Sequence, residues 1–218
     1  RKEALINAMK KNPSIGYESI SVIFYVDRGM NRSQQMFADL NRYAVKPSSS
    51  LGILYDHRDQ YSRFILDLIK EVEFFNHRIE YEKGGISNSS KKIFTLSSVY
   101  RATKFLSGSL SSQIKGKKSI SIEFWSKLSE IIEPWRCVKN GKDPAEIRKN
   151  TIALSSLALQ SLASLGASCI NDYPQNWLLK LNKLVKIDWH RTNPKWEGRA
   201  LVAGRLRQSY SNIILTGN

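Results

Sequence analysis

The alternation of apolar and polar positions predicts one strand and three helices in the first third of the chain. β-branched and aromatic residues fill positions 20–26, which is the composition typical of a strand. Apolar residues three and four positions apart predict helices over 2–11, 34–43 and 60–75. The first helix is expected to end at Pro13. Because that helix begins at the first residue without a cap, we expect the sequence to be a fragment.

The same periodicity predicts a helical second part. Helices are expected over 96–106, 122–132, 144–165 and 174–186. The stretch 151–167 is rich in Ala, Ser and Leu, which is typical of a buried helix that neighbouring helices approach closely.

The order of these elements predicts an α+β fold that is predominantly helical. An α/β front over residues 1–82 is expected to precede a basic helical domain over residues 83–218. The chain has no apolar run of about 18 residues, the length that a membrane span requires. With 41% hydrophobic residues, it has enough apolar side chains to form a core.

The net charge of the chain indicates which class of partner it binds. Lys and Arg number 34 against 19 Asp and Glu, so the net charge is +15. This excess predicts a polyanionic partner, with nucleic acid first, although a basic surface kept for solubility is an alternative. Two cysteines cannot form a disulfide framework, which favours a reducing, cytoplasmic setting.

The positive charge gathers in two segments. Positions 83–122 contain no Asp or Glu, and positions 180–218 hold eight cations against two acids. Trp177, Trp189, Trp196 and Tyr210 lie among or beside the cations of the second segment, where they suit either base stacking or anchoring of a core. The candidate DNA-binding residues are Lys91, Lys92, Arg101, Lys104, Lys115, Lys117, Lys118, Lys195, Arg199, Arg205 and Arg207.

Two further clusters contain groups that are able to do chemistry. In Asp56-His57-Arg58-Asp59, carboxylates, an imidazole and a guanidinium are adjacent, so they could hold a metal-bound phosphate or orient a water molecule. The alternative is that Asp56 or Asp59 caps the helix that follows. Gln34 and Asn41 are seven residues apart and share one side of the helix over 34–43, for which Asn31 or Ser33 is the expected cap. The spacing of the three His and two Cys predicts no metal site, and Cys137 and Cys169 are expected to be ordinary core thiols.

The string from Ser33 to Ser48, continuing through Leu54 to Asp59, resembles the DndB family. These are DNA sulfur modification proteins of the bacterial phosphorothioate system, in a wider group named for an Asp-Gly-Gln-His-Arg motif. The segments Asn193–Arg199 and Ser209–Asn212 resemble the same family. Arg1 corresponds to the last residue of the motif.

The resemblance implies a DNA-binding transcriptional regulator, a repressor of the modification gene cluster. It also implies a ParB/sulfiredoxin-like α/β front, partly missing at the N-terminus, and binding and hydrolysis of ATP with Mg²⁺. The implied catalytic residues are Arg1, Asp56 and His57, and the implied nucleotide-binding residues are Arg1, Gln34, Asn41, Arg58 and Asp59.

Three functions therefore remain open from the sequence. The first is a promoter-binding regulator whose partner is double-stranded DNA. The second is an ATPase for which DNA contact is secondary, and the third is a scaffold that recruits other proteins of the sulfur modification pathway. The oligomeric state is open too, with a homo-oligomer as one alternative.

Overall fold

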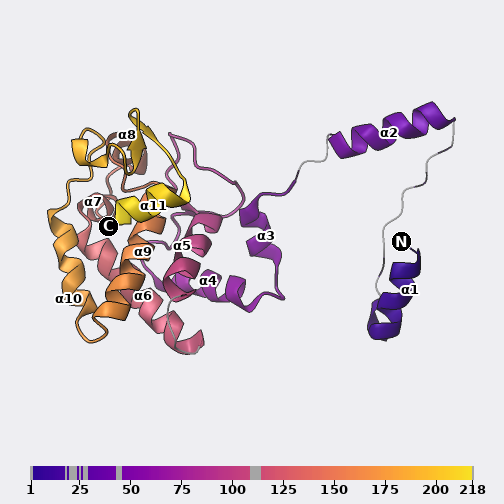
Figure 1. The fold of residues 1–218 in the computed structure, drawn as a ribbon, viewed down its shortest axis with the longest axis horizontal. Helices are drawn as coiled ribbons and strands as arrows, with labels where there is room; N and C mark the ends of the chain where they lie inside the picture. Colours follow the sequence, from indigo (N-terminus) through magenta and orange to yellow (C-terminus); the bar gives the residue numbers. More distant parts are fainter. Residues whose placement is uncertain are drawn as a thin grey trace. The chain divides into compact units, whose positions relative to one another are not determined.

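The computed structural model describes residues 2–17, 19, 24, 26, 29–42, 46–108 and 114–217, and helices predominate among them (Figure 1). The chain divides into two compact units, residues 1–46 and residues 47–218, and each unit is described by itself.

The first unit contains α1 (Lys2–Lys11), a 3-10 helix η1 (Pro13–Tyr17) and α2 (Met30–Arg42). The predicted helix over 2–11 is confirmed, and it ends immediately before Asn12 and Pro13. The predicted strand over 20–26 falls mostly on residues outside the described ones.

Helix α2 confirms the predicted helix over 34–43 but begins four residues earlier, so the expected cap is wrong. Asn31 and Ser33 lie inside the helix rather than before it. Gly29 precedes the helix with φ 102, a conformation that glycine adopts without steric cost. Its carbonyl oxygen accepts hydrogen bonds from the backbone N–H groups of Arg32 and Ser33, which begins the helical ladder.

The second unit is a helical assembly with two small sheets. Its elements are α3 (Ser49–Tyr55), α4 (Gln60–Glu71), β1 (Ile79–Glu80), β2 (Phe94–Thr95), α5 (Leu96–Gly108), α6 (Ile114–Ile131), α7 (Glu133–Lys139), α8 (Pro144–Asn150), α9 (Ser156–Asp172), α10 (Trp177–Leu181), η2 (Asn182–Lys186), η3 (Pro194–Trp196), β3 (Leu201–Val202), β4 (Arg205–Leu206) and α11 (Tyr210–Gly217). Strands β1 and β2 pair in parallel and β3 and β4 pair antiparallel. The predominantly helical α+β class is therefore confirmed, whereas the ParB-like α/β front is not.

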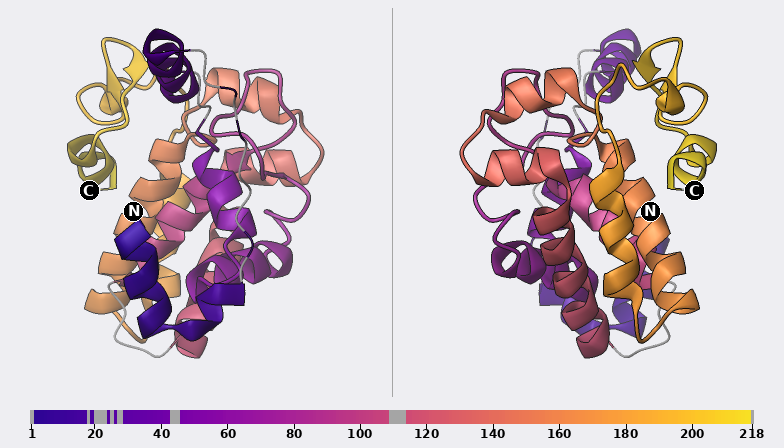
Figure 2. Two further views of the ribbon diagram at one scale, coloured as in Figure 1. Left: turned by 90° about the vertical axis from the view of Figure 1, so that its right-hand side faces the viewer. Right: turned by 90° about the vertical axis from the view of Figure 1, so that its left-hand side faces the viewer.

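Helix α9 is the central packing element of the second unit. It packs against α5, α10 and α11, and α10 runs beside it (Figures 1 and 2). Leu159 and Ala163 on α9 are fully buried. At Gly166 a side chain would meet the ring of Phe124 from α6, so glycine leaves room for that ring against α9.

An aromatic cluster forms the other part of the core. Trp135 of α7 stacks on Phe74 with 4.8 Å between ring centroids, and Phe94 of β2 meets it edge-on at 5.7 Å. Trp125 of α6 lies 6.4 Å from Trp135 in a stacked orientation. All four side chains are almost fully buried. The cluster joins α6, α7 and the β1–β2 region in one apolar layer.

The predicted helix over 144–165 is wrong in one respect, because it breaks into α8 and α9. Residues 151–154 are buried but not helical. Thr151 forms a β-bridge with His190, and the N–H of Ile152 donates to the carbonyl oxygen of Trp189 at 3.0 Å. These long-range backbone bonds replace helical ones, and the Ser155 side chain then caps α9.

Three other predicted helices have different bounds. Helix α4 ends at Glu71 rather than at residue 75, and α6 begins at Ile114 rather than at residue 122. The predicted helix over 174–186 consists of the five-residue α10 followed by the 3-10 helix η2. Helix α5 confirms the prediction over 96–106.

The division between the units falls before Pro47, whereas the sequence pattern suggested a boundary after residue 82. Ile65 and Leu68 of α4 are fully buried and belong to the same core as α5 and α6. Residues 47–82 therefore fold with the basic helical part.

No helix within the described residues has the length and hydropathy needed to cross a membrane.

Candidate nucleic-acid interface

Asp59 confirms the capping alternative for the charged cluster at 56–59. Its carboxylate accepts hydrogen bonds from the N–H groups of Tyr61 at 3.0 Å and Ser62 at 3.0 Å, and from the Ser62 hydroxyl at 2.7 Å. The hydroxyl of Tyr100 donates to the same carboxylate at 3.3 Å. These bonds, led by the one from the Ser62 side chain, lower the pKa of Asp59 below its ordinary value of 3.8.

We expect Asp59→Ala to lower the free energy of unfolding by about 1 kcal/mol at neutral pH, because α4 loses its cap. The pKa of Asp59 is lowered by folding, so its contribution is present above the unfolded-state pKa and is lost as the pH falls through the folded-state value. The difference between parent and variant should therefore shrink below about pH 5 in urea titrations. A difference that grows toward acid pH would contradict this assignment.

The remaining members of the cluster are more exposed. Asp56 Oδ1 accepts from the N–H groups of Arg58 and Asp59 at 3.1 and 3.2 Å, which closes the turn before α4. His57 and Arg58 are exposed. A hollow of about 320 Å³ lies beside Asp56 and Asp59, and Arg101 of α5 also lines it.

The residues that the resemblance implied for a nucleotide pocket are divided between the two units, and each unit is described by itself. Gln34 is exposed on α2, in the first unit, whereas Asp56 and Asp59 belong to the second. Arg1 and the side chain of Asn41 lie outside the described residues. The catalytic and nucleotide-binding assignments therefore stay predictions.

Three arginines from different parts of the second unit line one hollow of about 320 Å³. Arg101 comes from α5, Arg148 from α8 and Arg191 from the loop before η3. We call this site the arginine hollow. No Asp or Glu lines it, and none of the three arginines forms an ion pair within the part of the chain that the structure describes. The hollow therefore gathers three guanidinium groups that form no direct ion pair with any described residue.

The guanidinium of Arg148 holds the loop that forms one wall of the arginine hollow. Its Nη1 donates to the carbonyl oxygens of Ser87, Asn88 and Ser90 at 3.1–3.3 Å, and its Nη2 donates to that of Lys92. Burial lowers the pKa of Arg148. The role of this residue is mainly to shape the site.

Arg191 and Arg101 have the donors that remain available. Arg191 Nη2 donates to the carbonyl oxygen of Arg148 at 3.2 Å, while its buried Nε has no acceptor among the described residues. Burial lowers the pKa of Arg191, and no carboxylate offsets that effect. Arg101 is exposed. Half-buried guanidinium groups without a carboxylate partner favour an anionic ligand.

The N-terminus of α9 adds a further source of positive potential. Ser155 and Ser156 line the arginine hollow at the start of this 17-residue helix. The Ser155 hydroxyl accepts from the N–H of Ala158 at 3.1 Å, so one of the first N–H groups is satisfied. The others have no partner within the helix and attract anions.

The candidate DNA-binding residues from the sequence divide into available and engaged side chains. Exposed ones are Lys91, Arg101, Lys104, Lys195, Arg199, Arg205 and Arg207. Lys104 lies over the ring of Tyr100, and Arg199 Nη1 donates to the carbonyl oxygen of Leu215 at 2.9 Å. Lys92 donates to the carbonyl oxygen of His77 at 3.0 Å. Lys117 is half-buried, and the side chain of Lys115 lies outside the described residues.

Lys118 is paired within the chain, although its own segment contains no acid. Its ammonium lies 2.5 Å from Glu71 Oε1 and 3.9 Å from Asp67 Oδ2, both on α4. The hydrogen bond to Glu71 raises the pKa of Lys118. The acid-free segment is thus partly neutralised by a neighbouring helix.

The tryptophans that alternate with the C-terminal cations are core residues. Trp177, Trp189 and Trp196 are 5–7% exposed, so their faces are not open to a base. Trp189 and Trp196 stack on each other with 5.7 Å between centroids. Tyr210 differs, because it is 70% exposed. The stacking alternative is therefore wrong for these three tryptophans.

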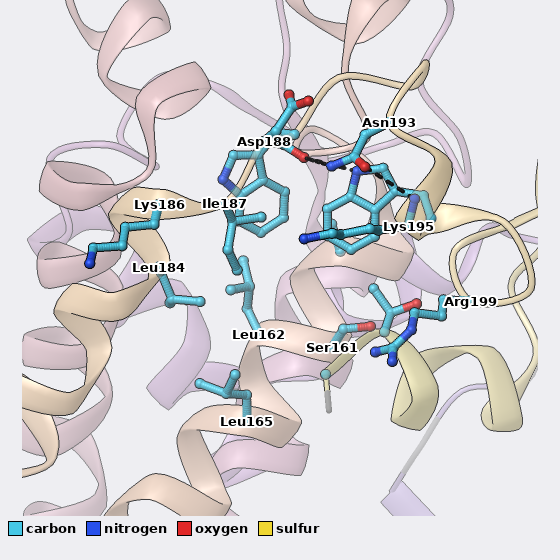
Figure 3. A pocket seen from close by; sticks show the side chains of 15 residues that line it. Ser161, Leu162, Leu165, Leu184, Lys186, Ile187, Asp188, Asn193, Lys195 and Arg199 are labelled. Atoms are coloured by element: carbon cyan, nitrogen blue, oxygen red, sulfur yellow. Dashed lines mark hydrogen bonds between the residues drawn. The ribbon is translucent and has the colours of Figure 1, made fainter.

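A cavity of about 610 Å³ lies between α9 and the 184–199 segment (Figure 3). Apolar side chains of α9 and of the chain after α10 line it, including Leu162, Leu165 and Leu184. Polar side chains at its edge include Lys195 and Arg199. This cavity was not anticipated from the sequence.

The cysteines have no feature of a reactive thiol. Cys137 Sγ donates to Glu133 Oε1 at 2.9 Å, and this hydrogen bond raises the pKa of the thiol. Burial raises the pKa of Cys169. No cluster of three His, Cys, Asp or Glu side chains suited to a metal is present among the described residues.

Sequence reasoning missed Arg148 altogether and did not group Arg191 with Arg101. Arg148 stands two positions after Glu146 in a segment predicted to be helical, so no local excess of charge marks it. Only tertiary structure brings it within hydrogen-bonding distance of Arg191, 43 positions away. The only signal in the sequence was that Arg148 and Arg191 each stand in a segment flanked by loops.

The second unit is thus mostly helical, and three of its arginines line one hollow at the N-terminus of α9. A family model matches residues 1–218 and is described as DndB, DNA-sulfur modification-associated. The chain therefore belongs to the DndB family, and the resemblance seen in the sequence is confirmed. No curated protein and no solved structure matches the chain. Membership of the family assigns the chain a role in a DNA sulfur modification system.

Proposed function

We propose that the chain is a DNA-binding regulator of a sulfur modification gene cluster and that the arginine hollow contacts the DNA backbone. The observation that carries the proposal is the half-buried guanidinium of Arg191, which lies beside Arg101 and Arg148 with no carboxylate on the hollow. A phosphate diester would supply the missing negative charge. Arginine pairs with phosphate through two parallel hydrogen bonds, which makes it better suited than lysine.

The surroundings of the arginine hollow extend the positive surface. Lys149 lines an adjoining hollow together with Arg148 and Arg191, and Glu146 is the one acid among the described residues on it, so three cations face one carboxylate there. Leu206 and Gln208 line the arginine hollow, and the exposed Arg205 and Arg207 alternate with them along the chain. Several phosphates along one DNA backbone could thus be contacted from this side. Such contacts set affinity and orientation, while sequence is read elsewhere in the complex.

Binding to promoter DNA tests the proposal. Fluorescence anisotropy would compare a labelled duplex from the promoter of the modification genes with a scrambled duplex of equal length and composition. We expect the parent to prefer the promoter duplex, and Arg101→Gln to weaken binding of both duplexes about tenfold, since it removes a charge-assisted hydrogen bond. Arg63→Gln is the matched control, because Arg63 is exposed on α4 and does not line the hollow.

Two outcomes would overturn parts of the proposal. Equal affinity of the parent for both duplexes would remove the regulatory function and leave a general DNA binder. Equal weakening by Arg101→Gln and Arg63→Gln would remove the arginine hollow from the interface.

ATP is the second candidate ligand, and one observation favours a place for its phosphates. Asp56 and Asp59 lie beside Arg101 on a common hollow, so the donor set combines carboxylates suited to Mg²⁺ with a guanidinium suited to phosphate. Both carboxylates also accept local backbone hydrogen bonds, which fits the capping role equally well. Repeating the anisotropy titration with ATP and Mg²⁺ while measuring phosphate release separates a modulated regulator from an ATPase.

A further inference from the structure

The cavity of about 610 Å³ has the composition of a small-molecule site (Figure 3). Its volume lies within the range of ligand pockets, which is about 300–1,000 Å³. Aliphatic side chains of α9 and of the 184–187 segment form most of its wall, together with the buried indoles of Trp189 and Trp196. Such a wall suits a ligand with an aromatic or branched apolar body.

Unpartnered polar atoms gather beside this cavity. Six buried side-chain polar atoms lack a hydrogen-bond partner among the described residues, and three of them belong to residues that line it: Ser161 Oγ, Trp189 Nε1 and Thr216 Oγ1. Ser161 is 2% exposed and Trp189 is 5% exposed. Buried polar groups in native proteins nearly always have a partner. A ligand with hydrogen-bonding groups would provide partners for these atoms.

The charged side chains at the edge of the cavity determine whether an anionic or a cationic ligand fits it. Lys186, Lys195 and Arg199 line it, and in Figure 3 the guanidinium of Arg199 lies near Ser161 while Lys195 extends toward Ile187. Asp188 is the one acidic residue among the described lining residues, and its carboxylate is engaged by His190, whose Nδ1 lies 2.8 Å from Oδ1. The cavity edge therefore has three cationic side chains against one acid, and that acid is hydrogen-bonded to His190.

From these features we infer that the cavity binds a small amphipathic organic anion, whose apolar body lies against the aliphatic side chains of α9 and whose acidic group faces Lys195. This site is distinct from the arginine hollow, because the two sets of lining residues have no member in common. The inference therefore does not depend on DNA binding.

Two dyes that differ by one charged group test the inference on the full chain. The dye 1-anilinonaphthalene-8-sulfonate is an aromatic anion, and N-phenyl-1-naphthylamine is its uncharged analogue. We expect the parent to bind one equivalent of the sulfonate, with rising dye fluorescence and quenching of tryptophan emission. The uncharged analogue should bind more weakly.

Variants then locate the site. Lys195→Gln should weaken the affinity for the sulfonate up to about fivefold, since a partly exposed ion pair contributes little more than this. The affinity for the uncharged dye should stay unchanged. Lys183→Gln is the matched control, because Lys183 is exposed on η2 and does not line the cavity. Leu165→Trp, which fills the cavity from α9, should abolish binding of both dyes. Circular dichroism would confirm that each variant is folded.

The results that overturn the inference are equally definite. No saturable sulfonate binding, equal affinities of the parent for both dyes, or sulfonate binding that Lys195→Gln leaves unchanged would each contradict it. Because none of these titrations contains DNA, failure here leaves the proposed regulator untouched. Likewise, a failure of the DNA-binding experiments leaves the inference about the cavity untouched.

Discussion

Replacing Trp135 with alanine is expected to lower the free energy of unfolding by about 3–5 kcal/mol, the range for large aromatic residues in cores. The indole is fully buried and contacts Phe74, Phe94 and Trp125. Its Nε1 also donates to the carbonyl oxygen of Ala153 at 3.0 Å, which links α7 to the segment before α9. The variant leaves both a cavity and an unpaired carbonyl group.

Urea titration of parent and variant measures this effect, with tryptophan emission and circular dichroism as probes. Tyr55→Ala is the control, because Tyr55 is an aromatic residue that is 68% exposed. It should change the free energy of unfolding by no more than about 0.5 kcal/mol. A loss below about 1 kcal/mol for Trp135→Ala would contradict the described core.

Arg148→Ala is expected to cost about 2 kcal/mol of folding stability and to release the loop at 87–92. The guanidinium donates hydrogen bonds to four carbonyl oxygens of that loop. A hydrogen bond to a charged group contributes about 1.5–3 kcal/mol to folding stability. We take a value toward the lower end because water can replace part of these bonds in an exposed loop. Hydrogen exchange of the backbone N–H groups at 87–92, together with urea titration, measures both effects.

Arg148→Lys is the informative comparison. A lysine retains the charge, but its single ammonium cannot span carbonyl groups spread over six residues of the loop. We therefore expect it to recover little of the lost protection. Full recovery by lysine would show that charge rather than the planar guanidinium holds the loop.

Local features were predictable from the sequence wherever neighbouring residues decide the structure. Helix α4 follows from its apolar periodicity, and Asp59 precedes it at the position where a carboxylate caps a helix. The capping role needed only residues 59–62. The family was also recognisable, because a continuous string of residues resembles it.

Features that depend on distant residues were not predictable. The break between α8 and α9 arises because Ile152 bonds Trp189 rather than continuing a helix, and no local breaker marks that point. Lys118 appeared free because Glu71, its partner, belongs to another helix. The arginine hollow needs α5, α8 and the loop at 191 together. Each of these is a long-range contact that composition and periodicity do not encode.

The central claim is that the arginine hollow neutralises DNA phosphates, and the salt dependence of DNA binding tests it most directly. The slope of log Kobs against log salt reports the number of phosphates neutralised, at about 0.9 per phosphate. If Arg101 and Arg191 each contact a phosphate, Arg101→Gln/Arg191→Gln should have a slope shallower than that of the parent by about 2. A double variant with the slope of the parent would contradict the account.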